Sequence, residues 1–277
     1  MNYNPKLSII IPCFNDLKFI ENAVKYANIQ TYDNKEIIVV DDGSNLETKK
    51  VLKNLETKID NLITQKNSGA GAARNTGIKE ANGDFILVWD ADDYFEPEFA
   101  IKAIEIFKKN NGVKVVTCWA RWFKENNEHQ IFKPSGGKLK DFLLHNAAIG
   151  TSMFKKKDWQ IVGGYDEKMS GFEDWEFYIR LHENGGHTMV IPEVLFHYRK
   201  KKNSRNDYAN SIKYQLLEYI YIKHQNSYCE NFQTFVKFFL QQSAILENTI
   251  RKRENSLDFK IGRIVLKPIR FIKKMFF

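Results

Sequence analysis

The stretch FILVWDADDYFEP, residues 85–97, joins a run of five apolar residues to three aspartates within four positions. A short apolar run without polar alternation is typical of a strand that is buried on both faces. Asp90, Asp92 and Asp93 follow, and carboxylates this close together repel one another unless a positive group lies between them. The stretch therefore predicts a buried strand whose carboxyl end carries acidic side chains around a cation.

Three similar apolar runs precede this strand, and segments with helical spacing separate them. Apolar residues recur every three or four positions between 17 and 27 and between 100 and 107, and small residues dominate from 69 to 81. Such alternation predicts an α/β fold, with a mainly parallel, Rossmann-like sheet and helices on both faces. The three runs are LSIII (7–11), EIIVV (36–40) and NLIT (61–64).

The chain changes character at about residue 211. Before it, VKVVTCW (113–119) and HTMVI (187–191) are typical of strands, the second ended by Pro192, and residues 120–170 show no regular period. After it, the pattern is helical and aromatic. We therefore expect three parts, a domain over residues 1–210, a helical extension over 211–256 and a tail over 257–277.

The net charge of +8 is concentrated at the C-terminal end. Residues 257–277 hold six Lys or Arg against Asp258, a net +5, which leaves only +3 for residues 1–256. So small an excess on the main body does not predict binding to nucleic acid.

The cysteines and the apolar runs indicate a cytoplasmic protein. Cys13, Cys118 and Cys229 show neither zinc-site spacing nor a disulfide framework, which fits a reducing compartment. The N-terminus lacks the pattern of a signal peptide, and no apolar run approaches the roughly 20 residues that span a bilayer. We expect a soluble chain.

Polar clusters follow three of the predicted strands. PCFN (12–15), DDGS (41–44) and DADD (90–93) each come at a strand's carboxyl end, where open parallel sheets bind ligands. Each cluster alone is better explained by a turn, but three at matching positions favour one site. Carboxylates suit Mg²⁺ or Mn²⁺, which commonly bind together with substrate phosphates. The clusters therefore predict a metal that carries a nucleotide diphosphate and assists its departure.

Residues 69–77, GAGAARNTG, begin like a dinucleotide-binding fingerprint. Arg74 occupies the sixth place, which that fingerprint reserves for Gly or Ala, and the segment follows the third strand, so we exclude NAD binding. The small residues instead predict close helix packing, with Arg74 directed toward a nucleotide. An arginine on the helix surface is the alternative.

A second acidic pair, Glu173-Asp174, begins a helix predicted at about 173–184. One acid is explained by the positive end of the helix dipole. The aromatic setting of Phe172, Trp175 and Tyr178 suits the walls of a sugar pocket, where a carboxylate can take a proton from an acceptor hydroxyl.

The chain resembles the family 2 glycosyltransferases of the GT-A fold, the inverting enzymes of bacterial polysaccharide and lipooligosaccharide assembly. The family's motifs are matched in order by SIIIPCFND, VVDDGS, QKNSGAGAARNTGI, LVWDADDYFEPEF, GGYDEKMSGFEDWEFYIRL and FHYRKKKNS, over about residues 5–205. The resemblance implies a UDP-sugar donor and a divalent cation, Mn²⁺ or Mg²⁺. It also implies single displacement, by which an α-linked donor yields a β-glycoside on a glycan or lipid-linked acceptor.

The resemblance implies roles for individual residues. Asp174 would be the catalytic base and Asp92 the metal ligand. Nucleotide contacts would come from Pro12, Phe14, Asp42, Lys66, Arg74, Asp90 and Ala91. The acceptor or sugar pocket would include Thr151, Glu173 and Trp175. The diphosphate would be met by His197, Arg199, Lys201 and Lys202.

The chain departs from the family in its last motif. Many members carry a histidine two residues after the Tyr-Arg pair, where this sequence has Lys201. We therefore expect electrostatic stabilisation of the diphosphate from this region and no third metal ligand. For His197, a histidine that is only hydrogen-bonded within a strand is an equally good interpretation.

Two other functions compete with transfer. A sugar nucleotidyltransferase would normally carry a glycine-rich loop after the first strand, where PCFN stands here. A non-catalytic protein that binds sugar nucleotide or glycan at the membrane is the rival from another class. The presence of both Asp92 and Asp174 argues against it.

The tail, residues 257–277, has the pattern of a basic amphipathic helix. Its basic residues are spaced three or four apart among apolar ones, which suits an anionic membrane surface. A helix packed on the body is the alternative. We expect peripheral association with the inner face of the cell membrane. The spaced residues are Lys260, Arg263, Lys267, Arg270 and Lys274.

Overall fold

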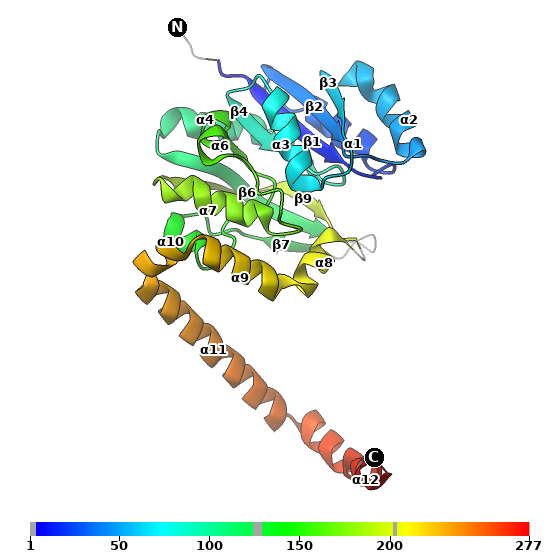
Figure 1. The fold of residues 1–277 in the computed structure, drawn as a ribbon, viewed down its shortest axis with the longest axis vertical. Coiled ribbons are helices and arrows are strands. Elements are labelled where there is room, and N and C mark those ends of the chain that lie inside the picture. Colours follow the sequence, from blue (N-terminus) through cyan, green and yellow to red (C-terminus); the bar gives the residue numbers. More distant parts are fainter. Residues whose placement is uncertain (1–3, 124–128, 202–203, 277) are drawn as a thin grey trace. The chain divides into compact units, whose positions relative to one another are not determined.

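The structure is a computed structural model, and it describes residues 4–123, 129–201 and 204–276. The chain forms two compact units, residues 1–227 and 228–277, and Figure 1 labels most of their elements. The strands of the described residues are β1 Leu7–Cys13, β2 Lys35–Asp41, β3 Asn61–Thr64, β4 Phe85–Val88, β5 Tyr94–Phe95, β6 Val113–Phe123, β7 His129–Phe132, β8 Met153–Lys155 and β9 His187–Arg199.

The strands form one sheet with the order β3-β2-β1-β4-β8-β6-β9-β5, and β7 pairs with β6. Strands β3, β2, β1 and β4 are parallel, as are β6 and β9. The predicted α/β fold is confirmed, but β5, β7 and β8 pair antiparallel, so the complete sheet is mixed. These strands have only two to four residues, too few to show a period.

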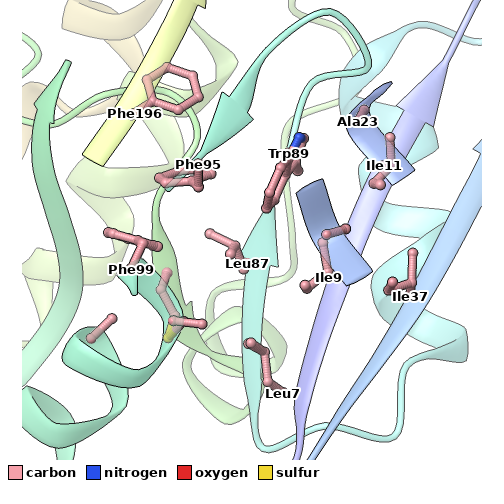
Figure 2. Close-up of a cluster of buried hydrophobic side chains, with 14 of the residues drawn as sticks. Leu7, Ile9, Ile11, Ala23, Ile37, Leu87, Trp89, Phe95, Phe99 and Phe196 are labelled. Atoms are coloured by element: carbon pink, nitrogen blue, oxygen red, sulfur yellow. The ribbon is translucent and has the colours of Figure 1, made fainter. Parts of the chain in front are cut away.

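The parallel strands β1, β2 and β4 are buried on both faces. Ile9 and Ile11 of β1 belong to a core cluster with α1 and α4, part of which Figure 2 shows. Ile10 faces α3 instead, where a Cβ on Gly77 would lie 2.6 Å from Ile10 Cγ2 and 3.0 Å from Val40 Cγ2. Only glycine lets α3 pack this closely on β1 and β2, as the run of small residues predicts.

The helices predicted near 17–27, 69–81, 100–107 and 173–184 are confirmed as α1, α3, α4 and α7. The helices of the first unit are α1 Ile20–Asn28, α2 Leu46–Leu55, the 3₁₀ turn η1 Glu56–Lys58, α3 Ala70–Glu80, α4 Phe99–Lys109, α5 Leu139–Phe142, α6 Lys156–Val162, α7 Glu173–Glu183, α8 Arg205–Ser211 and α9 Lys213–Lys223. The short helix α10 Gln225–Glu230 runs across the boundary of the two units.

The prediction that Pro192 ends the last strand is wrong. Strand β9 continues to Arg199 beside β6, and its register shifts where Ile191 pairs with Cys118 and Val194 with Trp119. The shift leaves Pro192 outside the regular ladder, where its missing N–H costs nothing. The continuation matters because it brings Arg199 and the segment after it to the carboxyl edge of the sheet.

The second unit contains α11 Phe232–Asn255 and α12 Leu257–Phe276, separated at Ser256. The Ser256 hydroxyl accepts a hydrogen bond from the Phe259 amide at 3.3 Å, and none of the α11 side chains is buried. The helix predicted for the tail is confirmed. Within the described ranges, no helix is both long and apolar enough to cross a membrane. The predicted boundaries at 211 and 257 stay predictions.

Candidate active site

The turns after β1 and β2 are hydrogen-bonded to each other. The Asp42 amide donates to the Cys13 carbonyl at 2.9 Å, and the Asn15 amide donates to Ser44 Oγ at 3.0 Å. Asn15 has a left-handed backbone, with φ 58°, which asparagine tolerates better than most residues. The first two polar clusters therefore meet at one edge of the sheet.

Asp42 holds the loop that precedes α3. Its Oδ1 accepts hydrogen bonds from Gln65 Nε2 at 2.8 Å and from the Ser68 amide at 2.9 Å. Its Oδ2 accepts from the amide of Gly69 at 2.9 Å. Both oxygens of this buried carboxylate thus shape the loop, on which Lys66 is exposed. The contact of Asp42 with a nucleobase stays a prediction.

The acidic loop after β4 is a tight turn. The Asp93 amide donates to the Asp90 carbonyl at 3.1 Å, and Trp89 Nε1 donates to the Asp93 carbonyl at 3.0 Å. The turn buries Ala91 and leaves the side chains of Asp90 and Asp92 partly exposed. Two of the three acids can therefore meet a ligand.

Lys201 brings a positive charge to this loop. Its Nζ lies 2.8 Å from Asp92 Oδ2, 3.0 Å from Asp16 Oδ1 and 4.7 Å from the centroid of the Phe19 ring. Burial raises the pKa of Asp92 above its usual value, against the opposing effect of Lys201. Burial would lower the pKa of Lys201, but the two carboxylates raise it. A lysine from beyond β9 thus joins acids that follow β1 and β4.

Asp93 ties the acidic loop to the end of β9. Its Oδ1 accepts a hydrogen bond from the Arg199 amide at 2.8 Å, and Arg199 Nε donates to the Asp92 carbonyl at 3.2 Å. The Arg199 guanidinium lies over the rings of Phe19 and Phe123, 4.7 Å from each centroid. Burial and the neighbouring aspartates raise the pKa of Asp93 well above its usual value. Asp93 is therefore a structural member of the loop.

A buried arginine connects the two acidic motifs. Arg74 is 3% exposed, with Nη2 2.7 Å from Asp90 Oδ1 and Nη1 2.5 Å from Glu173 Oε1. Arg205 Nη2 lies 2.6 Å from Glu173 Oε2. Burial would raise the pKa of Glu173, but the two arginines lower it to about 2. Both oxygens of Glu173 are engaged, so this geometry does not support its predicted contact with an acceptor. Nor is Arg74 the surface arginine of the alternative interpretation.

Asp174, the predicted base, lies in the first turn of α7. Its Oδ2 accepts a hydrogen bond from Asn146 Nδ2 at 2.8 Å, and a Cβ on Gly150 would lie 2.8 Å from the same oxygen. Burial and the charge of Glu173 raise the pKa of Asp174, against the effects of Arg74 and Asn146. Neighbouring carboxyls whose pKa values move in opposite directions commonly divide the roles of counter-ion and proton carrier.

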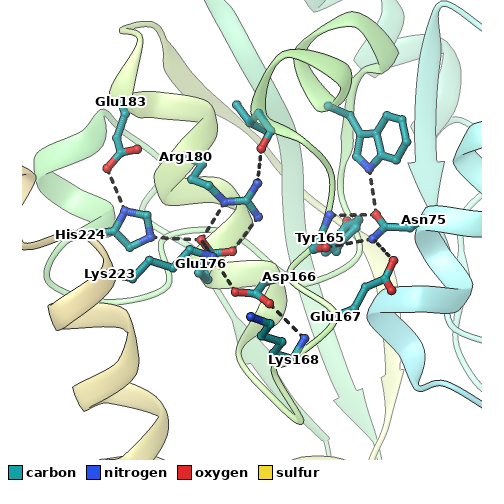
Figure 3. Close-up of polar contacts among 12 residues, drawn as sticks. Asn75, Tyr165, Asp166, Glu167, Lys168, Glu176, Arg180, Glu183, Lys223 and His224 are labelled. Atoms are coloured by element: carbon teal, nitrogen blue, oxygen red, sulfur yellow. Dashed lines mark hydrogen bonds and ion pairs between the residues drawn. The ribbon is translucent and has the colours of Figure 1, made fainter.

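Asn75, next to Arg74 on α3, fixes the loop that leads to α7, as Figure 3 shows. Its Oδ1 accepts hydrogen bonds from the Tyr165 amide at 2.8 Å and from Trp159 Nε1 at 3.1 Å. Its Nδ2 donates to the Tyr165 carbonyl and to Glu167 Oε1, both at 2.9 Å. The side-chain amide of Asn75 therefore holds the loop at two points.

Glu176 connects α7 to the C-terminal end of α9 (Figure 3). It is fully buried, and both of its oxygens bind Arg180, at 2.7 and 2.6 Å. Lys223 Nζ lies 2.8 Å and His224 Nε2 3.1 Å from Glu176 Oε1, and His224 Nδ1 is 2.8 Å from Glu183. Burial would raise the pKa of Glu176, but these partners lower it to about 2. The cluster holds the helix that carries the predicted base.

Other predicted pocket residues differ in exposure. Pro12 is partly buried, and Phe14 is 48% exposed after β1. Trp175 is buried, and its Nε1 donates to the Phe142 carbonyl at 2.6 Å, so its ring packs inside the domain. Thr151 is also buried, and its hydroxyl has no hydrogen-bond partner among the residues described. Their contacts with substrate stay predictions.

His197 has the partners of a strand histidine. Its Nε2 is 2.7 Å from Glu96 Oε1, and its ring stacks on Tyr94 with the centroids 4.4 Å apart. Burial lowers the pKa of His197, against the effect of Glu96. This geometry supports the second interpretation of His197 and not a diphosphate contact. Lys202, also predicted there, lies outside the described residues.

The predicted metal site depends on Asp92. Among the described side chains, no group of three His, Cys, Asp or Glu is arranged to hold a metal. Mg²⁺ and related cations often use one or two carboxylates plus substrate phosphates. Beside Asp92 Oδ2 there is already room for a positive group, because Lys201 Nζ lies there. The acidic loop therefore fits a cation that arrives with phosphates better than one held by protein ligands alone.

Three residues of the site were missed by sequence reasoning, namely Asp16, Asn146 and Arg205. Asp16 follows the first strand within the PCFND segment, so its position was a usable signal. Asn146 lies in a segment without periodicity, and Arg205 follows the last sheet strand. Nothing in their local sequence indicates partners so distant along the chain.

Comparison with known proteins agrees with the geometry. Residues 8–174 match the model of the family described as glycosyl transferase family 2. An uncharacterised glycosyltransferase of Methanocaldococcus jannaschii is 28% identical over 250 residues, which cover 85% of this chain and 86% of that protein. The chondroitin synthase of Escherichia coli is 29% identical over 189 residues, which cover 65% of this chain but 27% of the synthase.

Solved structures share the fold. S. aureus TarS in complex with UDP-GlcNAc has a TM-score of 0.72 at 18% identity, covering 92% of this chain and 77% of TarS. The mannosyltransferase PcManGT from Pyrobaculum calidifontis, in complex with GDP-Man and Mn²⁺, has a TM-score of 0.61 at 15% identity, covering 94% and 84%. The fold is therefore that of the GT-A glycosyltransferases. Because the matched residues 8–174 make up more than half of the chain and contain both acidic motifs, this protein is a glycosyltransferase that belongs to family 2.

Proposed function

We propose that the protein transfers a sugar from a UDP-sugar to a hydroxyl of a glycan or lipid-linked acceptor, with inversion, in the synthesis of a cell-surface polysaccharide. The observation that carries the proposal is the bridge made by Arg74, which binds both Asp90 and Glu173, the neighbour of Asp174. One buried side chain thus links the acidic loop to the first turn of the helix that carries Asp174. The UDP-GlcNAc complex of TarS and the chondroitin synthase relative support the substrate class.

The diphosphate of the donor would lie beside the acidic loop. Lys201 and Arg199 offer positive charge there, and Arg74 faces the same loop from α3. Preorganised charges of this kind stabilise a leaving anion without reorganising during the reaction. The exposed ring of Phe14, at the end of β1, is suited to stack on the nucleobase.

A divalent cation fits Asp92 together with the donor's phosphates. The bound Mn²⁺ of PcManGT supports this assignment for a protein of the same fold. When bound, the cation would offset the charge that develops on the leaving diphosphate. Asp92 would be its protein ligand, and Asp90, engaged by Arg74, would not be free to share it in the arrangement seen here.

Asp174 would act as the base of a single displacement. It takes the proton of the acceptor hydroxyl while the oxygen attacks the anomeric carbon and the bond from that carbon to the diphosphate breaks. Glu173, ionised between two arginines, keeps its own charge and raises the affinity of Asp174 for a proton. Attack from the face opposite the leaving group inverts the configuration.

The proposal is tested by nucleotide release from a panel of UDP-sugars with glycan and lipid-linked acceptors. We expect Asp174→Asn to lower transfer about 10²- to 10⁴-fold, the usual contribution of a general base, while UDP still binds. Asp158→Asn, at another buried aspartate paired with Lys114, is the control for the substitution itself. Binding of UDP-sugars without turnover by the wild type would contradict the proposal, and normal transfer by Asp174→Asn would contradict the base assignment.

The second unit would place the enzyme at the inner face of the cell membrane. The α12 residues described up to 266 include exposed apolar side chains beside the exposed Lys260 and Arg263. A helix with both kinds of side chain binds anionic lipid by apolar burial and charge attraction. Attachment there suits a lipid-linked acceptor. The exposed apolar side chains are Leu257, Phe259, Ile261, Ile264, Val265 and Leu266.

A further inference from the structure

Lys201 occupies the position of a cation in the acidic loop. Its ammonium lies between Asp92 Oδ2, at 2.8 Å, and Asp16 Oδ1, at 3.0 Å. The two acids follow different strands, β4 and β1, and the lysine follows β9. Three separate parts of the chain therefore converge on one ion-pair cluster. A chance contact of a flexible surface lysine would not need such an arrangement.

Protein groups partly enclose this ion-pair cluster. The side chains of Asp92, Asp16 and Lys201 are 19%, 24% and 34% exposed, so solvent screens them only in part. The Phe19 ring lies against the ammonium, 4.7 Å from its centroid. The neighbouring Lys200 points elsewhere, with Nζ 4.1 Å from the centroid of the Trp122 ring. Of these two neighbouring lysines, Lys201 is thus the one that pairs with Asp92 and Asp16.

An ammonium and a divalent cation beside the same oxygen of Asp92 repel each other. Lysine has three donors and no lone pair for a metal, so it competes with the cation and cannot help to ligate it. Arg74 and Arg199 lie around the same loop, and their charges add to the repulsion of a second cation. A diphosphate reverses this balance because it brings several negative charges and phosphate oxygens that can ligate the metal.

We infer that Lys201 is a resident counter-ion of Asp92, which a divalent cation displaces only when the nucleoside diphosphate enters with it. This inference rests on the proposed function, since it presumes a nucleotide donor. It adds an order of binding to that function, in which the divalent cation binds Asp92 only together with the nucleoside diphosphate. The metal alone is excluded, and the freed ammonium stays beside the phosphates.

The experiment measures Mn²⁺ affinity from the free-ion signal in electron paramagnetic resonance, with the full chain and with or without saturating UDP. Lys201→Gln removes the competitor, and Lys200→Gln is the matched control. Without UDP, we expect Lys201→Gln to bind Mn²⁺ at least about tenfold more tightly than the wild type and the control, a usual size of coupling. With UDP, the difference should shrink below about threefold.

Two further measurements keep the result decisive. Adding Asp92→Asn to Lys201→Gln should abolish the gained Mn²⁺ site, and a thermal melt checks that each variant is folded. Equal Mn²⁺ affinity of the wild type and Lys201→Gln without UDP, or a gained site that survives Asp92→Asn, overturns the inference. UDP binding is measured in parallel by calorimetry. If UDP does not bind the wild type, the proposed function fails; if it binds and the Mn²⁺ affinities are equal, only the role of Lys201 fails.

Discussion

Asn146 Nδ2 donates a hydrogen bond of 2.8 Å to Oδ2 of Asp174. The contact joins the segment between α5 and β8 to the first turn of α7. The hydrogen bond engages Oδ2 of the carboxylate and fixes the orientation of the carboxylate group, and with it the direction of Oδ1. Asn146 is therefore a positioning residue for the proposed base.

Removing this hydrogen bond should change the pH dependence of transfer. Asn146 lowers the pKa of Asp174, so Asn146→Ala should raise it further. A base works only when ionised, so the acid limb of the kcat/KM profile should move to higher pH. Near neutral pH, transfer should fall about tenfold, as expected for a lost hydrogen bond to a charged group. His145→Ala, at the exposed neighbouring residue, is the control, and an unmoved acid limb in Asn146→Ala would refute the positioning role.

Gly150 should tolerate no side chain. A Cβ there would lie 2.8 Å from Asp174 Oδ2, closer than such contacts allow. Gly150→Ala should therefore push the carboxylate aside and lower kcat by roughly 10²-fold, the usual cost of a misplaced catalytic group. Gly262→Ala, where nothing lies within 4 Å of the added Cβ, should leave kcat unchanged. Full activity in Gly150→Ala would show that Asp174 does not need this position.

Arg74 should matter for stability as well as for catalysis. Arg74→Met leaves Glu173, 2% exposed, with Arg205 as its remaining arginine, and should lower the free energy of unfolding by about 3–5 kcal/mol. Arg205→Ala, at a side chain 44% exposed, should cost less than about 1 kcal/mol. Urea denaturation measures both. Adding Glu173→Gln to Arg74→Met should recover part of the loss, because it removes the unpaired charge; no recovery would contradict the ion-pair explanation.

His224 should make stability depend on pH. Burial would lower the pKa of His224, but Glu176 and Glu183 raise it above its usual value. A raised histidine pKa contributes stability that is complete below its unfolded pKa of about 6.5 and is lost as pH rises through the folded value. The difference in unfolding free energy between wild type and His224→Gln should therefore shrink as pH increases from 6. Urea titrations across this range check it, with His145→Gln as an exposed control, and a constant difference would exclude the linkage.

Deletion of residues 257–277 should release the protein from anionic vesicles. The tail carries a net +5, and attraction of each basic residue to anionic lipid is worth roughly fivefold in affinity. Lys260→Gln with Arg263→Gln should therefore weaken vesicle sedimentation more than tenfold. Vesicles of zwitterionic lipid alone serve as the control. Undiminished binding of the deleted protein to anionic vesicles would contradict the role of α12.

Most elements of the first hundred residues were predictable because their signals are local, although α2 and β5 were not predicted. Strands β1, β2 and β4 are continuous apolar runs, and α1 and α4 repeat apolar residues every three or four positions. A strand of two or three residues, such as β5 or β8, has no such period. The run of β9 past Pro192 depends on the bulge against β6, a property of the partner strand and not of the local sequence.

The order of the motifs, and the strand ends that carry the first three polar clusters, can be read from the sequence alone. Which charge neutralises which depends on the tertiary fold. Lys201 and Asp16 are 185 positions apart, and Arg74 and Glu173 are 99 apart. Hydrophobic periodicity is a property of a few consecutive residues, whereas an ion pair depends on where two distant segments pack. Hence Glu173 proved to be a buried counter-ion beside Asp174, and the positive group among the aspartates proved to be the chain's own lysine and arginines.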